Sequence, residues 1–193
     1  MGITPIADRS NHGSDRTESA YRRGTRMVTV RVVNELTPQQ IDDLAEILIA
    51  VVAQGASVGF LPPLRREDAE RYWRGALKLE VVLLVAERDG RVVGTAQLEL
   101  AMRANGRHRA EVNKVLVHPG CQRQGIGRRL MTEIETVARW EGRTLLHLDT
   151  REGNSSNDVY RALGWTEAGR IPKWARSASG TLDATIFYFK ELD

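Results

Sequence analysis

Apolar residues recur along most of the chain with either a two-residue period or a period of three to four residues. Runs rich in β-branched and aromatic residues predict strands at 27–36, 81–87, 92–100, 108–117, 144–150, 167–174 and 185–192. Helical spacing predicts a helix from Pro38 behind an N-cap at Thr37, and further helices at 66–77, 126–140 and 157–163. The element order is therefore β-α-α-β-β-β-α-β-α-β-β. Residues 1–26 are polar and aperiodic, so we expect a disordered N-terminal arm before a domain at 27–193.

The segment from Val115 to Met131 combines the end of a strand, a glycine-containing loop and the start of a helix. Glycines stand at 120, 125 and 127, and apolar residues follow at helical spacing. The first turn of a helix carries unpaired N–H groups at the positive end of the helix dipole, and glycine lets an anion approach the backbone. The segment therefore predicts a cradle for a pyrophosphate.

Other interpretations of this loop compete with that one. The glycines can serve the turn alone, or Gly125-Ile126-Gly127 can begin a dinucleotide fingerprint with Asp149 as the ribose-binding acid. Leu130 stands where that fingerprint needs its third glycine. The Asp-Gly pair at 89–90 also predicts an antiparallel hairpin, which a doubly wound dinucleotide fold lacks. The Gly-x-x-x-x-Gly-Lys-Ser/Thr phosphate loop is absent here.

What remains is Gln122-x-x-Gly125-x-Gly127 directly after an apolar strand, which resembles the Gln/Arg-x-x-Gly-x-Gly/Ala signature of the GNAT superfamily of acetyl-CoA-dependent N-acetyltransferases. The element order extends the resemblance to about residues 27–192. It implies the GNAT fold, an α/β (α+β) domain with a mixed central sheet of about seven strands flanked by about four helices. Within the superfamily, segments of this chain are similar to the tabtoxin-resistance acetyltransferase group, whose members acetylate a small β-lactam amino-acid toxin. These segments are 55–60, 109–112, 145–150 and 186–190.

The resemblance implies acetyl-CoA as the cosubstrate. The fourth strand is expected to separate from the fifth, so that its backbone pairs with the pantetheine arm and the thioester oxygen. The expected contacts to this arm are Val115, Leu116 and Val117. The loop would hold the pyrophosphate through backbone N–H groups, with Arg123 or Arg128 adding charge. The expected loop contacts are Gln122, Arg123, Gln124, Gly125, Ile126, Gly127 and Arg128.

Tyr160 matches the tyrosine that GNAT enzymes commonly place near the CoA sulfur. A phenol, whose ordinary pKa is about 10, stays protonated at neutral pH and can donate a proton to the departing thiolate. GNAT enzymes often carry an asparagine seven positions before this tyrosine. The present chain has Gly153 there and Asn154 beside it, so Asn154 is the candidate for that pantetheine contact.

Two carboxylates are candidates for removing the proton of an ammonium acceptor. Glu111 lies on the cofactor strand and shares a face with Asn113, Val115 and Val117 if alternation is unbroken. Asp149 ends the adjacent strand, so both acids would border the gap where the strands diverge. Either can bind the ammonium or act as a general base, and the sequence does not separate the two roles.

Phe60 and Trp174 are candidate walls of the acceptor pocket, with core packing as the alternative for Phe60. Phe60 lies in a glycine- and proline-rich segment, and Trp174 precedes the last strand. The histidines at 108, 118 and 147 lack metal-ligand spacing, so we expect no metal.

Composition narrows the class of protein further. The chain has 193 residues, of which 41% are hydrophobic and 27% charged, as in a soluble domain. It contains one cysteine, no signal-peptide pattern and no apolar run that could span a bilayer, so we expect a cytoplasmic location. The formal net charge is only +3, which gives little support to nucleic-acid binding. The expected partner is a small-molecule amine, with no nucleic acid and no membrane, and a homodimer is compatible with the sequence.

The sequence therefore predicts an acetyl-CoA-dependent N-acetyltransferase that works by direct transfer in a ternary complex. Its expected acceptor is the amino group of a small molecule, such as an amino-acid-like toxin, an antibiotic or a metabolite. Two alternatives stay open. One is a protein or peptide N-acetyltransferase, which needs an open peptide groove, and the other is a CoA-binding sensor module without turnover.

Overall fold

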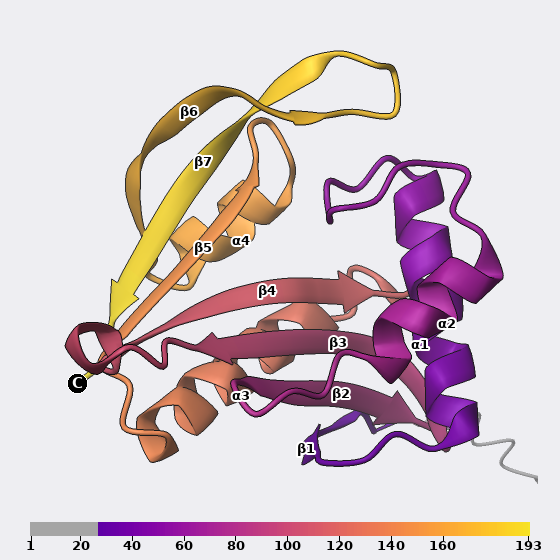
Figure 1. Ribbon diagram of the computed structural model, residues 1–193, viewed down its shortest axis with the longest axis horizontal. Helices are drawn as coiled ribbons and strands as arrows, with labels where there is room; N and C mark the ends of the chain where they lie inside the picture. Colours follow the sequence, from indigo (N-terminus) through magenta and orange to yellow (C-terminus); the bar gives the residue numbers. More distant parts are fainter. Residues whose placement is uncertain (1–26) are drawn as a thin grey trace, which may run out of the picture.

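The computed structural model describes residues 27–193 and builds them around one seven-stranded sheet (Figure 1). The strands are β1 (Thr29–Val33), β2 (Val81–Arg88), β3 (Arg91–Leu100), β4 (Arg109–Val117), β5 (Leu145–Arg151), β6 (Thr166–Arg176) and β7 (Leu182–Glu191). The helices are α1 (Pro38–Ala53), α2 (Arg66–Arg74), α3 (Ile126–Trp140) and α4 (Ser156–Ala162), with short 3-10 turns η1 (Ala104–Gly106) and η2 (Pro119–Cys121). The predicted element order is confirmed, and the predicted N-terminal arm lies outside the described residues.

The strand order in the sheet is β1-β2-β3-β4-β5-β7-β6. Within residues 27–193 the β4–β5 pair is parallel and every other neighbouring pair is antiparallel, so the expected mixed sheet is confirmed. The turn between β2 and β3 has the predicted tight form, because Asp89 (φ 52°) and Gly90 (φ 76°) both adopt the left-handed backbone that a two-residue hairpin loop requires.

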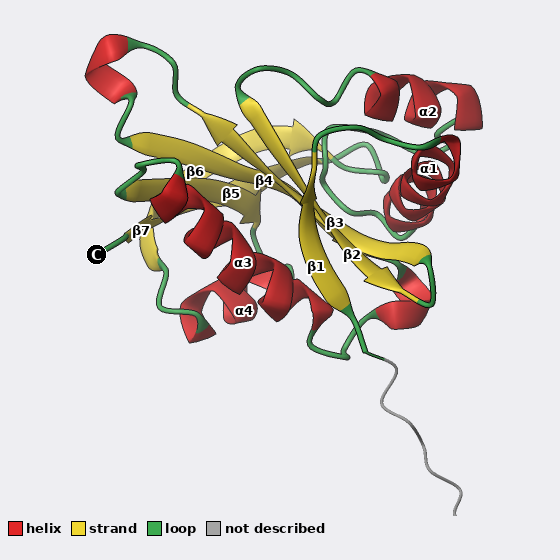
Figure 2. Ribbon diagram, turned by 90° about the horizontal axis from the view of Figure 1, so that it is seen from below, coloured by secondary structure: helices red, strands yellow, loops and turns green. Residues whose placement is uncertain are grey.

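Helices cover both faces of the sheet, with α1 and α2 on one face and α3 and α4 on the other (Figure 2). Each helix pair has its own hydrophobic core. Leu44, Leu48 and Trp73 pack on the α1–α2 face, and Leu130 and Ile134 pack on the α3 face. Trp73 is fully buried, and burying an aromatic or aliphatic side chain of this size contributes about 1.5–3 kcal/mol. The sheet is thus packed between two cores, which fixes the positions of its strand ends.

The start of α1 follows from its sequence. The Thr37 side chain accepts a hydrogen bond from the Gln40 N–H, and the Gln40 side chain accepts one from the Thr37 N–H, which completes a capping box. One turn later, the buried Asp43 accepts hydrogen bonds from Arg91 and from the Val92 N–H. These contacts tie α1 to the start of β3.

The strands β4 and β5 form a fork. Their pairing is limited to Arg109–Glu111 on β4 and Leu145–His147 on β5, and beyond these residues the strands diverge (Figure 1). On their other sides, β4 stays paired with β3 and β5 stays paired with β7. The edges that face each other across the fork therefore carry unpaired backbone N–H and C=O groups. The predicted separation of the fourth and fifth strands is confirmed.

A β-bulge interrupts β4 just beyond the fork point. Asn113 pairs with Gln97 and Leu116 pairs with Thr95, so two residues of β4 oppose a single residue of β3. The first of the two, Lys114, has a left-handed backbone (φ 50°). The bulge reverses the alternation of side chains along the rest of the strand.

The expectation that Glu111 shares a face with Val115 and Val117 required unbroken alternation, and this bulge breaks it after Asn113. Ala110 and Val112 pack in the core on the α3 face, so Glu111 between them faces α1 and α2. Val115 also packs against the α3 core, whereas Leu116 packs in the core with α1. Glu111 therefore shares its face with Leu116 and not with Val115 or Val117, which flank Leu116.

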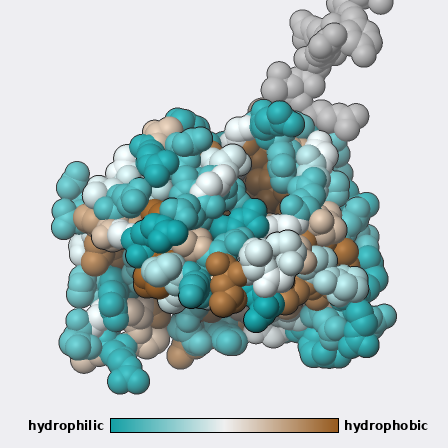
Figure 3. All heavy atoms as spheres, turned by 90° about the horizontal axis from the view of Figure 1, so that it is seen from above, coloured by the Kyte–Doolittle hydropathy of each residue, from teal (hydrophilic) through white to brown (hydrophobic). Residues whose placement is uncertain are grey.

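Polar and charged side chains cover most of the face seen from above, with separate apolar patches between them (Figure 3). None of the helices described between residues 27 and 193 is both long and apolar enough to cross a membrane.

Candidate active site

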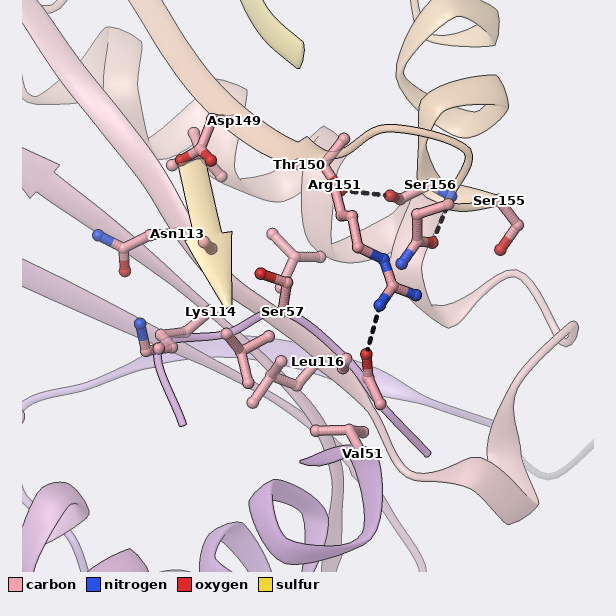
Figure 4. A pocket seen from close by; sticks show the side chains of 18 of the residues that line it. Val51, Ser57, Asn113, Lys114, Leu116, Asp149, Thr150, Arg151, Ser155 and Ser156 are labelled. Carbon is pink, nitrogen blue, oxygen red and sulfur yellow. Dashed lines mark hydrogen bonds between the residues drawn. The ribbon is translucent and has the colours of Figure 1, made fainter. Parts of the chain in front are cut away.

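The fork between β4 and β5 opens into a cavity of about 530 Å³. Its lining comes from β4, the end of β5, the loop at 54–59, α4 with the residue before it, and the end of β6 (Figure 4). The charged side chains that line it are Glu111, Lys114, Asp149 and Arg151. Segments that are far apart in the sequence therefore meet at the point where the sheet separates.

The glycine-containing loop at the end of β4 presents backbone donors. Arg123 (φ 57°) and Gly125 (φ 79°) have left-handed backbones, and Gly125 is the N-cap of α3. The N–H groups of residues 123–128 donate to no acceptor within the described part of the chain. A Cβ atom added to Gly127 would meet only Val117, at 3.9 Å, so the space before the first helical turn is open. This donor set suits a pyrophosphate.

The side chains of the loop contribute less than its backbone. Gln124 accepts a hydrogen bond from Arg88 (2.8 Å), which draws its amide away from the start of α3. Ile126 is buried in the core on the α3 face, so only its backbone can serve a ligand. Arg123 and Arg128 are exposed on either side of the first helical turn and can reach an anion bound there.

The unpaired part of β4 borders the cavity directly. Val115, Leu116 and Val117 all line it, and their backbone on the β5 side has no strand partner. At the end of this stretch, the Gln122 side chain donates a hydrogen bond to the Val117 carbonyl (3.2 Å). An extended ligand arm can therefore enter the fork and meet backbone groups from the end of β4 to the first turn of α3.

Tyr160 reaches the cavity from α4. Its ring is buried next to Trp165 (6.1 Å between ring centroids) and Tyr188 (5.8 Å). Burial, with added effects of the charges of Asp149 and Tyr188, raises the pKa of Tyr160 to about 12. Its hydroxyl makes no hydrogen bond within residues 27–193 and lies at the cavity wall. Tyr160 is therefore a protonated donor at neutral pH, with its proton available to a ligand.

Glu111 and Asp149 lie on opposite branches of the fork. Glu111 is in the last rung that joins β4 to β5, opposite His147, and its carboxylate makes no hydrogen bond or ion pair within the described residues. Burial raises the pKa of Glu111 above its ordinary value, against the opposing effect of His147, and the neighbouring acids add to the rise. Asp149 instead accepts a hydrogen bond from the Thr185 hydroxyl (2.7 Å), which fixes the orientation of its carboxylate.

The two predicted aromatic walls have different positions. Trp174 lines the cavity from β6, with its ring 5.3 Å from that of Phe187 and 51% of its surface exposed. Phe60 is outside the lining of this cavity and packs edge-on against Tyr72, at 5.3 Å. The loop before Phe60 turns the backbone of residues 55–59 toward the cavity instead.

Comparison with known protein families identifies the family to which this chain belongs. The model of the Acetyltransferase (GNAT) family matches residues 51–165, which include both branches of the fork and the glycine-containing loop. The chain belongs to the GNAT acetyltransferase family. It is an acetyl-CoA-dependent N-acetyltransferase, and acetyl-CoA supplies the acetyl group as a thioester when it is bound.

Relatives of this GNAT enzyme agree with that assignment. An uncharacterized N-acetyltransferase from the hisH-hisA intergenic region of Azospirillum brasilense is 36% identical over 150 residues, which is 75% of this chain and 89% of the relative. The structure of yncA from Salmonella typhimurium, solved with its cofactor acetyl-CoA, has a TM-score of 0.71 and 23% identity, and the match covers 86% and 94% of the two chains. A ribosomal-protein-alanine N-acetyltransferase from Brucella melitensis has a TM-score of 0.72 and 24% identity, with 85% and 99% covered.

Asn154 lies on the cavity wall, but its side chain is already engaged. Its Oδ1 accepts a hydrogen bond from the Ser156 N–H (3.0 Å), in the turn that leads into α4. The neighbouring Gly153 has a left-handed backbone (φ 77°) that begins this turn. The side-chain nitrogen of Asn154, Nδ2, donates to no acceptor in the described residues and is left to serve a cofactor in this GNAT domain.

Sequence reasoning missed two charged residues of the site. Arg151, at the end of β5, donates a hydrogen bond to the Gly55 carbonyl (3.1 Å) and lies 3.7 Å from Asp183. It thus holds the loop at 55–59 against the β5 branch. Lys114 enters the cavity because of the β4 bulge, and strand alternation alone would have turned it toward the α3 core. Nothing in the local sequence signals either contact.

Proposed function

We propose that this GNAT enzyme transfers the acetyl group of acetyl-CoA to the amino group of a small, amino-acid-like molecule by direct transfer in a ternary complex. The observation that carries the proposal is the cavity itself, which brings two carboxylates to the fork within about 530 Å³. Small-molecule sites have volumes of about 300–1,000 Å³. A cavity of this size, shared with the thioester end of acetyl-CoA, leaves room for a small acceptor.

We assign the general base to Glu111. Its carboxylate is half-buried at the fork, it has no hydrogen-bond partner of its own in the described chain, and its pKa is raised, each of which suits a group that accepts a proton from the acceptor. Asp149, held by the Thr185 hydroxyl, is instead suited to bind the ammonium of the acceptor in a fixed direction.

Tyr160 supplies the proton for the departing thiolate. The buried phenol is protonated at neutral pH, and its hydroxyl faces the cavity without a competing acceptor in the described residues. The backbone of Val115, Leu116 and Val117 orients the thioester arm and can polarise its carbonyl oxygen. The acceptor approaches from the side of Trp174 and the loop at 55–59.

The tabtoxin-resistance likeness of segments 55–60, 109–112, 145–150 and 186–190 supports an amino-acid-like acceptor. A fold relative proposed to be a phosphinothricin N-acetyltransferase, with 22% identity and a TM-score of 0.71, is named for a small molecule of that kind. The competing acceptor is a protein N-terminus, as the name of the Brucella melitensis relative indicates for that protein. We favour the small molecule because Trp174 and the loop at 55–59 both line the cavity and restrict the room for a peptide.

Incubation with acetyl-CoA and two acceptor panels tests the proposal. One panel contains free amino acids and small amines, and the other contains peptides with free N-termini, and the release of free CoA thiol is followed. We expect release with members of the first panel and none with the second. Release with peptides alone would replace the small-molecule proposal by protein acetylation. Calorimetric binding of CoA without release in either panel would identify a sensor module.

A further inference from the structure

Lys114 has an unusual backbone for its residue type. It occupies the first position of the β4 bulge with φ 50°, a left-handed conformation that side chains larger than those of Gly, Asn and Asp seldom adopt. Glycine would satisfy the bulge without strain. A lysine at this position is therefore best explained by what its side chain does.

The bulge directs the Lys114 side chain into the acceptor side of the cavity. Its ammonium lies over the Tyr72 ring, 5.6 Å from the ring centroid, and a Cβ atom on Gly59 would be 3.9 Å from it. Phe60 packs edge-on against the same Tyr72 ring, with 5.3 Å between the ring centroids. Figure 4 shows Lys114 and Asn113 on the left of the cavity, across from Arg151 on the right.

The ammonium of Lys114 is half-buried but has no strong partner. Within residues 27–193 this ammonium forms no hydrogen bond and no ion pair within 4 Å. Glu111 and Asp149 still lie close enough to interact with its charge. Burial lowers the pKa of Lys114, against the effect of these acids. Arg151, the other cation of the cavity, directs its Nη1 to the Gly55 carbonyl and lies 3.7 Å from Asp183 through the same nitrogen. Lys114 differs from it because none of its ammonium donors is engaged within the described residues.

We propose that Lys114 binds an anionic group of the acceptor, most simply its carboxylate, while the carboxylates of Glu111 and Asp149 receive the amino group. The inference rests on the acceptor site proposed above and adds its specificity determinant. A half-buried ammonium and two carboxylates in one cavity complement a zwitterion, which brings an opposite charge to each. A neutral amine leaves the ammonium without a partner.

The test compares each amino acid with its amide, which keeps the amine and removes the negative charge. In Lys114→Met, the KM for the amino acid should rise roughly ten- to a hundredfold, as expected for loss of a hydrogen bond between charged groups. The KM for the amide and the affinity for CoA should not change. Lys114→Arg should restore part of the wild-type difference in KM between the amino acid and its amide. A rise in KM that is equal for acid and amide would overturn the proposal.

Two further variants separate this role from a structural one. Lys114→Gly relieves the left-handed backbone, so it should unfold at the same temperature as the wild type or higher while showing the same loss for the acid. Lys173→Met is the matched control, because Lys173 also has a left-handed backbone (φ 54°) but is exposed on β6 outside the cavity lining. It should leave both KM values unchanged, and a loss there equal to that of Lys114→Met would contradict the assignment.

A binding measurement keeps the inference separate from turnover. Short carboxylic acids without an amino group are titrated calorimetrically into the protein in the presence of CoA. The wild type should bind them, and Lys114→Met should bind them at least roughly tenfold more weakly. Equal binding by both proteins would overturn the inference even if amines are acetylated. Absence of thiol release with every amine would overturn the proposed function, while unequal carboxylate binding would still support the role of Lys114.

Discussion

The two halves of the proposed site offer their ligands different groups. The proposed cofactor half consists mainly of backbone, namely the unpaired edge of β4 in the cavity and the N–H groups of residues 123–128 beyond it. The acceptor half consists of side chains, with Glu111, Lys114 and Trp174 brought together from β4 and β6. The first half is one continuous segment, whereas the second exists only after the sheet has formed.

The difference shows how much each half depends on its sequence. A donor set made of backbone survives most side-chain substitutions, provided that the left-handed turn at Gly125 is kept. A pocket made of side chains changes its specificity with single substitutions. Changes in the acceptor half should therefore alter turnover without altering CoA affinity, and changes in the loop backbone should do the reverse.

The largest effect is expected for Glu111→Gln. Loss of the proposed base should lower kcat/KM on the order of a thousandfold, with the calorimetric affinity for CoA unchanged. Glu99→Gln is the matched control, because Glu99 pairs directly with Glu111 across the β3–β4 ladder but is exposed and outside the cavity lining. Turnover of Glu111→Gln close to that of the wild type would transfer the base role to Asp149.

A smaller loss is expected for Tyr160→Phe. A thiol has an ordinary pKa of about 8.5, so it can depart as a thiolate with less acid assistance than an ammonium needs base assistance to lose its proton. We therefore expect kcat to fall on the order of a hundredfold. CoA affinity should stay unchanged, because the hydroxyl makes no bond that positions α4 in the described structure. A loss of CoA affinity that matches the loss of kcat would show that Tyr160 acts in binding.

The cofactor half is tested by a pair of loop variants. Gly125→Val forces a β-branched residue into the left-handed conformation, which costs about 1–2 kcal/mol and should weaken CoA binding roughly tenfold. Gln124→Ala removes a side chain that is bonded to Arg88 and should change the CoA dissociation constant little. Calorimetry on both proteins, with thermal unfolding to measure the folded fraction, decides the comparison. A greater loss for Gln124→Ala would contradict a cradle made of backbone.

The smallest effect concerns pH. Because a base must be ionised, activity is present above the pKa of Glu111 and is lost as the pH falls through it. Burial raises this pKa, so the acid limb of kcat/KM should lie above the ordinary glutamate value of about 4.3. Glu99→Gln removes a neighbouring negative charge that raises the pKa of Glu111, so it should move the limb to lower pH. A limb at the ordinary value, or a shift to higher pH, would contradict the assignment.

Most of the fold was predictable because its signals are local. The capping residues at 37–40, the Asp-Gly turn at 89–90 and the amphipathic pattern of α3 each depend on neighbours in sequence, and each agrees with the structure. The glycine-containing loop was predictable for the same reason. The helix and strand periods carry this information directly.

The acceptor half was less predictable because it depends on register. A bulge in β4 adds one residue relative to β3, and no residue type marks it, since a lysine stands at the left-handed position. The alternation assumed from Glu111 to Val117 therefore fails after Asn113. For the same reason, Lys114 was not identified as a residue of the cavity. Phe60 was expected at the acceptor, but its ring packs against Tyr72, a contact across two elements that periodicity does not show.

The fork between β4 and β5 also bears on how the protein avoids association with other chains. Unpaired strand edges are templates for the addition of foreign β-strands and lead to aggregation. Here the two edges face each other inside the sheet, and Trp174 and the loop at 55–59 stand at their opening. The elements that we propose to line the acceptor site thus also restrict access to the unpaired backbone, so a shortened loop at 55–59 should give a protein that self-associates until acetyl-CoA fills the fork.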